Sequence, residues 1–140
     1  MLDEAGGLFR RSTNVGEFAD LRVPMQMRYV RRAAEEGGIG LKGVKVKIVR
    51  DPELVGSGFL GMTDEGGRVI RLLPDSFQDL ETLIKTLGHE RTHIMQRRIF
   101  GRGTDATFMR QMEDAAYGIE SEFWEYYLRH GRTGRLEELR

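Results

Sequence analysis

The residues best suited to chemistry are two histidines four positions apart, with a glutamate directly after the first. Residues 89–93 read His-Glu-Arg-Thr-His, an instance of the pattern H-E-x-x-H. On a helix, positions i and i+4 share one face, so His89 and His93 can direct both imidazoles at one metal ion. Glu90 is rotated by about 100° from His89, which places it beside the ion as a general base. A zinc ion lowers the pKa of a bound water to roughly 7, and Glu90 is predicted to take the proton of that water.

The rest of the sequence restricts how a metal could be held. The chain has no cysteine, so its metal ligands must be His, Asp or Glu, and two of its three histidines belong to the pattern. Gly88, just before the pattern, lets another backbone or a substrate approach the helix closely. Two histidines leave a catalytic zinc one protein ligand short. A metzincin would supply a third histidine six residues after His93, but Ile99 occupies that position.

A glutamate from the following helix is the alternative third ligand. Glu113 is flanked by apolar and aromatic residues, where a carboxylate is costly to bury unless it is paired or bound to metal. Glu113 is therefore the predicted ligand, and one zinc ion per chain is the predicted cofactor. Glu120 lies two turns further along on nearly the same face and remains the rival, whereas Glu122 and Glu125 are typical of solvated surface charges.

The elements that must position these residues follow from the apolar spacing along the chain. The patterns predict a helix, three short strands and two long helices, over residues 25–36, 44–49, 59–62, 68–73, 77–100 and 105–130. Ser76 with Asp79 resembles a capping box before the first long helix, and Thr104 or Asp105 can cap the second. The second long helix is apolar around much of its circumference, so we expect it to be largely buried.

This order predicts an α+β fold with an N-terminal helix, a small three-stranded sheet and two long helices that carry the metal site. A length of 140 residues fits one domain. We expect an N-terminal arm or fragment boundary over residues 1–24, the domain itself over 25–131, and a polar tail over 132–140.

Charge and hydropathy exclude several classes of function. Lys plus Arg and Asp plus Glu both total 22, and this zero net charge argues against a nucleic-acid partner. No apolar run approaches the roughly 20 residues of a membrane span. The first residues place acids before bases and have no apolar segment, so we expect no signal peptide. The expected location is the cytoplasm, or another compartment reached through a separate secretion apparatus.

The segments LGHERTHIMQ and MEDAAYGIE together resemble the gluzincins, the thermolysin-type zinc peptidases, and in particular the minimal zincin domains of bacterial polymorphic toxins and prophage-associated peptidases. The resemblance covers residues 25–130 in layout and only 87–96 and 112–120 in motif. It implies a metallopeptidase that cleaves a protein or peptide, a toxin effector as one role, and an inhibitory or immunity protein as a partner. By this analogy the strand 68–73 borders the cleft and aligns an extended peptide along its edge.

The sequence also departs from the family pattern. Thermolysin-type enzymes often carry an aspartate four residues after the third ligand to support a metal histidine, and here that residue is Tyr117. Asp114 or Glu120 is left to give this support. The family's oxyanion-stabilising histidine has no counterpart, because His130 lies at a helix end. Tyr117 is the predicted catalytic residue beside Glu90, with three other candidates for the same role: Tyr126, Tyr127 or an arginine.

Two functions from different classes fit these observations. The first is a zinc metallopeptidase that hydrolyses peptide bonds with a metal-activated water. The second is a zincin-fold module that binds a protein partner with little or no catalysis. The presence of Glu90 favours the enzyme, because a purely structural zinc site has no use for that acid.

Overall fold

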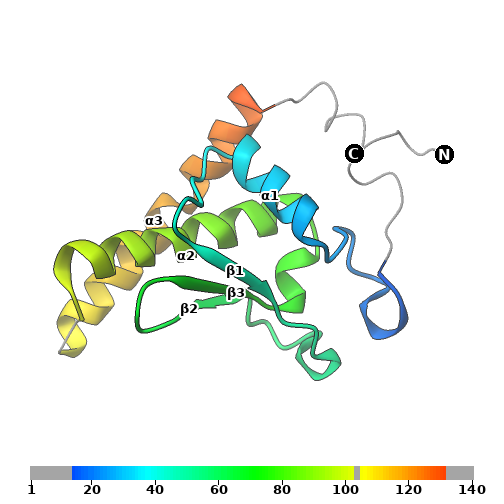
Figure 1. The fold of residues 1–140 in the computed structure, drawn as a ribbon, viewed down its shortest axis with the longest axis horizontal. Helices are drawn as coiled ribbons and strands as arrows, with labels where there is room; N and C mark the ends of the chain where they lie inside the picture. Colours follow the sequence, from blue (N-terminus) through cyan, green and yellow to red (C-terminus); the bar gives the residue numbers. More distant parts are fainter. Residues whose placement is uncertain (1–13, 103–104, 132–140) are drawn as a thin grey trace.

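The computed structural model describes residues 14–102 and 105–131, so the tail expected over 132–140 and the first 13 residues of the expected arm lie outside the described residues. Its elements are α1 (Met27–Glu36), β1 (Lys45–Ile48), β2 (Gly61–Thr63), β3 (Val69–Leu72), α2 (Leu80–Phe100) and α3 (Ala106–His130), with 3-10 helices η1 (Gly16–Phe18), η2 (Pro52–Leu54) and η3 (Pro74–Phe77) (Figure 1). The predicted α+β fold, with a small three-stranded sheet before two long helices, is confirmed.

The sheet has the strand order β1-β3-β2. Strand β1 runs parallel to β3 in the register Lys45↔Val69, and β2 runs antiparallel to β3 in the register Met62↔Arg71. Both edges of β3 are therefore paired, and the prediction that a peptide is added along residues 68–73 is wrong. Ile70 and Leu72 are fully buried on β3, which explains why this strand takes the central position. Strands β1 and β2 form the two edges.

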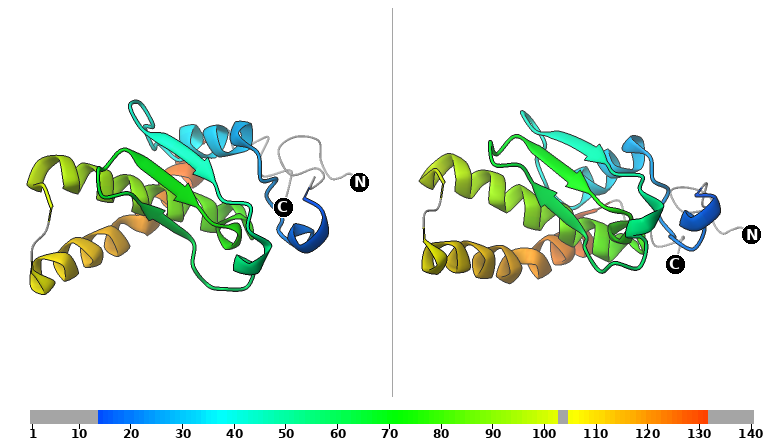
Figure 2. Two further views of the ribbon diagram at one scale, coloured as in Figure 1. Left: turned by 60° about the horizontal axis from the view of Figure 1, so that its bottom comes forward. Right: turned by 90° about the horizontal axis from the view of Figure 1, so that it is seen from below.

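Helix α2 lies between the sheet and α3, as the two views of Figure 2 show. Its buried apolar residues, Leu83, Ile84, Leu87 and Ile94, join those of β3 and α1 in one hydrophobic core. Each fully buried side chain of this size contributes roughly 1.5–3 kcal/mol to folding. The apolar stripe that predicted the helix is thus the surface that fixes α2 against the sheet, with the His-Glu-x-x-His segment in its middle.

The ends of the two long helices are set by aspartates. Asp79 caps α2 by accepting a hydrogen bond from the backbone N–H of Thr82 at 2.7 Å. The expected capping box at Ser76 is wrong, because Ser76 belongs to η3 and its hydroxyl donates to the carbonyl of Leu73. Asp105 caps α3 as predicted, since it accepts from the N–H of Phe108 at 2.8 Å.

Helix α3 lies on the outside of the molecule and packs mainly against α2 (Figure 2). Among its residues only Ala116 and Tyr127 are buried, so the prediction of a largely buried helix is wrong. A helix that contacts one neighbouring layer can bury only one stripe, and the remaining apolar side chains of α3, such as Met109, stay exposed.

The segment before α1 packs onto the core. Asn14 donates to the carbonyls of Leu21 and Val23 and accepts from the N–H of Met25, and the side chains of these three residues are buried. The core thus includes residues on the N-terminal side of residue 25. None of the helices in the described ranges combines the length and the apolar character needed to cross a membrane.

Candidate metal centre

Three side chains from α2 and α3 bring one ligand atom each to a common point. His89 Nε2 lies 3.1 Å from His93 Nε2, and Glu113 Oε1 lies 2.7 Å and 3.0 Å from these two atoms. The histidines stand one turn apart on α2, and Glu113 reaches across from α3. His89, His93 and Glu113 therefore form a group that could hold a metal ion, in agreement with the predicted ligand set.

The separations within this group are compatible with one tetrahedrally coordinated metal ion. Tetrahedral coordination at about 2.0–2.1 Å separates ligand atoms by roughly 3.3 Å, so the observed separations of 2.7–3.1 Å need to widen by only a few tenths of an ångström. Two neutral imidazoles and a carboxylate are also donor types that zinc accepts. Exposure matters as well, because His89 is buried whereas the Glu113 side chain is 48% exposed, leaving the cluster open on the α3 side. The expected burial of Glu113 is wrong.

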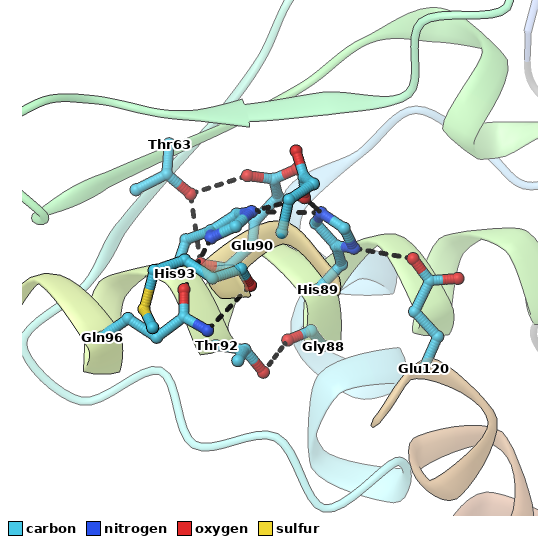
Figure 3. Close-up of polar contacts among 10 residues, drawn as sticks. Thr63, Gly88, His89, Glu90, Thr92, His93, Gln96 and Glu120 are labelled. Atoms are coloured by element: carbon cyan, nitrogen blue, oxygen red, sulfur yellow. Dashed lines mark hydrogen bonds and ion pairs between the residues drawn. The ribbon is translucent and has the colours of Figure 1, made fainter. Parts of the chain in front are cut away.

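The far nitrogen of each histidine has its own partner (Figure 3). His89 Nδ1 lies 2.7 Å from Glu120 Oε2, and His93 Nδ1 lies 2.9 Å from Gln96 Oε1. Both partners can accept a hydrogen bond from Nδ1, and in the tautomer that makes these bonds the lone pair of each Nε2 is directed toward Glu113. In that tautomer two lone pairs and a carboxylate oxygen converge, an arrangement that a cation stabilises.

Glu90 lies beside this cluster and is held by the sheet. The Thr63 hydroxyl on β2 donates to Glu90 Oε1 at 2.7 Å and lies 3.1 Å from the Glu90 carbonyl (Figure 3). Burial raises the pKa of the Glu90 carboxyl above its usual range, against the opposing effects of the Thr63 hydrogen bond and the two histidines. A carboxyl with a raised pKa is a stronger base once ionised.

The cluster opens into a cleft of about 430 Å³ between β2 and the N-terminal half of α3. One wall is the segment 58–63, including the exposed Phe59 and Met62, and the opposite wall includes Met109, Met112 and Tyr117. The Tyr117 ring packs edge-on against His89, with 4.6 Å between ring centroids. Tyr117 is thus placed at the cleft, and its catalytic role stays a prediction.

Two glycines allow the surrounding elements to approach α2. A Cβ on Gly88 would lie 2.1 Å from a ring carbon of Phe123, so this glycine admits the ring of α3. The expected substrate or backbone at this position is replaced by that ring. A Cβ on Gly61 would lie 2.9 Å from Thr86 and 3.3 Å from Glu90, so this glycine lets β2 lie close to Glu90.

The structure also settles where the other sequence candidates lie. Glu120 contacts His89 through the outer nitrogen, which is the supporting position, and not through the atom that faces the cluster. Asp114 is exposed and is not among the residues that line the cleft. The His130 ring lies tilted against that of Tyr126 at the end of α3, with 4.8 Å between ring centroids, and His130 is not among the residues that line the cleft.

Two residues of the site were missed by the sequence analysis. Gln96 stands three positions after His93, on the same helix face, and this spacing was a usable signal. Thr63 gave no signal, because its contact with Glu90 joins a three-residue strand to a helix 27 residues later. Comparisons with known protein families, curated proteins and solved structures find no match to this chain.

Proposed function

We propose that this protein is a zinc-dependent metallopeptidase, with His89, His93 and Glu113 as the metal ligands and Glu90 as the general base. One observation carries the proposal: three electron-pair donors converge in an open cleft, and a buried carboxylate faces the same cleft beside them. A site that only stabilises the fold would be closed by a fourth protein ligand, whereas this one leaves room for water and substrate.

Different residues of the site are proposed to carry out different steps of hydrolysis. A bound zinc ion supplies Lewis-acid chemistry, which polarises a carbonyl and makes water more acidic. Glu90 accepts the proton of the attacking water as the new C–O bond forms, and returns it to the amide nitrogen as the C–N bond breaks. Thr63 keeps Oε1 of Glu90 in place, which leaves Oε2 for the water. Tyr117 is the proposed donor to the developing oxyanion.

The substrate is proposed to be an extended peptide that pairs with the free edge of β2. Leu60 and Asp64 hydrogen-bond to β3. Antiparallel strands alternate the direction of their backbone groups, so the N–H and C=O of Gly61 and Thr63 point to the opposite edge. These groups border the cleft beside Glu90 and can align a main chain of any sequence.

The test combines zinc binding with the Glu90→Gln variant. Purified protein is loaded with zinc and incubated with casein and a fluorogenic peptide library, and cleavage is followed by mass spectrometry. The Glu90→Gln variant is expected to keep its zinc and to lose about 10²–10⁴-fold in activity. The matched control is Glu122→Gln, an exposed glutamate of α3, which is expected to cleave like the parent.

Three results would contradict the proposal. If the parent protein takes up no zinc, the proposed metal centre is wrong. If Glu90→Gln cleaves as fast as the parent, Glu90 is not the general base. If the parent takes up zinc but cleaves no substrate, the alternative of a zincin-fold binding module is favoured.

A further inference from the structure

The Gln96 side chain on α2 bridges His93 and the backbone of α3 next to Glu113. Its Oε1 accepts from His93 Nδ1 at 2.9 Å, and its Nε2 donates to the carbonyl of Met112 at 3.0 Å. Met112 directly precedes Glu113. The Met112 carbonyl requires a donor, which fixes the orientation of the amide, and Gln96 itself is buried at 8% exposure.

The part of α3 that Gln96 reaches has little else to hold it. Between Ala106 and Ala115 no residue is buried, and Met109 is 53% exposed. The Phe108 ring meets Phe100 edge-on at 6.0 Å near the start of the helix. Gly118 lies inside the continuous helix α3 with no atom within 4 Å of its missing side chain, and a glycine there lowers helix stability by about 1 kcal/mol relative to alanine.

The C-terminal half of α3 is anchored differently. Tyr127 is buried in the hydrophobic core, and the Phe123 ring packs over Gly88 of α2. The segment 106–117, which carries Glu113, therefore depends on a few contacts at the metal centre, and the part-buried hydrogen bond of the Gln96 amide to its backbone is one of them. Local stability follows the number of such contacts.

We infer that Gln96 is a positioning residue that sets the place of Glu113 relative to His93 by holding the segment 106–117 of α3 against α2. The inference rests on the proposed metal centre for its consequence in zinc affinity, but the hold on α3 is independent of zinc. Only a side chain with an acceptor and a donor can make both bonds, and glutamine has both.

Two substitutions separate the two bonds. Gln96→Met keeps the length and apolar stem of the side chain and removes both hydrogen bonds. Gln96→Glu keeps an acceptor for His93 Nδ1 and removes the donor to Met112. The matched control is Gln78→Met, the same substitution at an exposed glutamine just before α2. Thermal unfolding of each variant establishes that it is folded.

The first measurement is amide hydrogen exchange of the metal-free proteins. Both Gln96 variants lose the hydrogen bond to the Met112 carbonyl. This loss is expected to speed exchange in residues 106–117 by roughly 2- to 10-fold. Exchange in residues 120–130 is expected to stay unchanged, as is the whole pattern of Gln78→Met. Parental exchange in both Gln96 variants would overturn the inference, whether or not the protein binds zinc.

The second measurement is zinc affinity by competition with a chelator. Outer partners of metal ligands are typically worth 10- to 100-fold in affinity, and we expect Gln96→Met to lose affinity within about that range. Parental affinity in Gln96→Met would show that Gln96 does not position the ligands. Failure of the parent to bind zinc would instead contradict the proposed function, and the exchange result would still decide the hold on α3.

Discussion

Replacing Gly88 by alanine tests how closely α3 packs against the metal-binding helix. An ideal Cβ at this position would lie 2.1 Å, 2.6 Å and 2.7 Å from three ring carbons of Phe123. One of these is Cγ, the ring atom that is attached to Cβ, so rotating the ring about its own axis does not clear the clash. The substitution must displace the Phe123 ring, and a shift of the α3 backbone is the expected response.

The magnitude follows from two opposing effects. Alanine is favoured over glycine in a helix interior by about 1 kcal/mol. An added methyl in a well-packed interior costs about 1–3 kcal/mol, and a contact near 2 Å belongs at the upper end of that range. Gly88→Ala is therefore expected to lower the free energy of unfolding by about 1–2 kcal/mol. For a chain of this size that lowers Tm by about 3–10 °C.

The assay is thermal and urea unfolding of Gly88→Ala beside a matched control. Gly118→Ala places the same methyl in α3, where no atom lies within 4 Å, and is expected to raise stability by up to about 1 kcal/mol. A double-mutant cycle with Phe123→Leu then measures the coupling, because a smaller side chain should absorb part of the clash. We expect a coupling of about 1 kcal/mol.

Gly88→Ala also has a functional readout. A displaced α3 moves Glu113 and Glu120 away from His89, so zinc affinity is expected to fall with stability. If Gly88→Ala proves as stable as Gly118→Ala, the ring of Phe123 does not limit the approach of the helices and the reasoning fails.

Three further predictions concern the metal centre. Saturating zinc should raise Tm, by an amount equivalent to about 4 kcal/mol at 1,000 times the Kd, and a chelator should reverse it; an unchanged Tm would argue against binding to the folded state. Glu120→Ala is expected to lower zinc affinity by about 10- to 100-fold, and Glu113→Ala should lower it further. A zinc titration that gives the reverse order would make Glu120 the ligand. Thr63→Val should lower kcat with little change in KM or zinc content, and Thr63→Ser should restore it, because only the hydroxyl holds Glu90; equal rates for both variants would contradict this role.

The order of the elements was predictable from the sequence because each apolar pattern is local. The apolar stripe of α2 and the H-E-x-x-H spacing share the same helical period, so His89 and His93 were placed on one face without any tertiary information. Glu113 followed from chemistry, because two histidines leave zinc one ligand short. Apolar and aromatic residues do flank Glu113, but several of them line the open cleft and do not belong to the hydrophobic core.

The strand order was not predictable in the same way. The alternation in residues 44–49 and the apolar residues of 68–73 predict strands but do not say which strands pair. Here β1 pairs with β3, although β2 lies between them in the sequence. Aromatic and apolar residues around the circumference of α3 predict a buried helix. Some of them line the cleft instead of the core, such as Tyr117, which is 61% exposed.

The two edges of the sheet have different consequences for self-association. Strand β1 carries the exposed side chains of Lys45 and Lys47, which would meet like charges if two β1 edges paired. Strand β2 reads Gly-Met-Thr, without a charge, and is only three residues long. Two copies joined through β2 would present only lysine-bearing edges outward, so edge-to-edge pairing would stop at a dimer and would not extend into a fibril. Access of a peptide to the cleft would then compete with that dimer at high protein concentration.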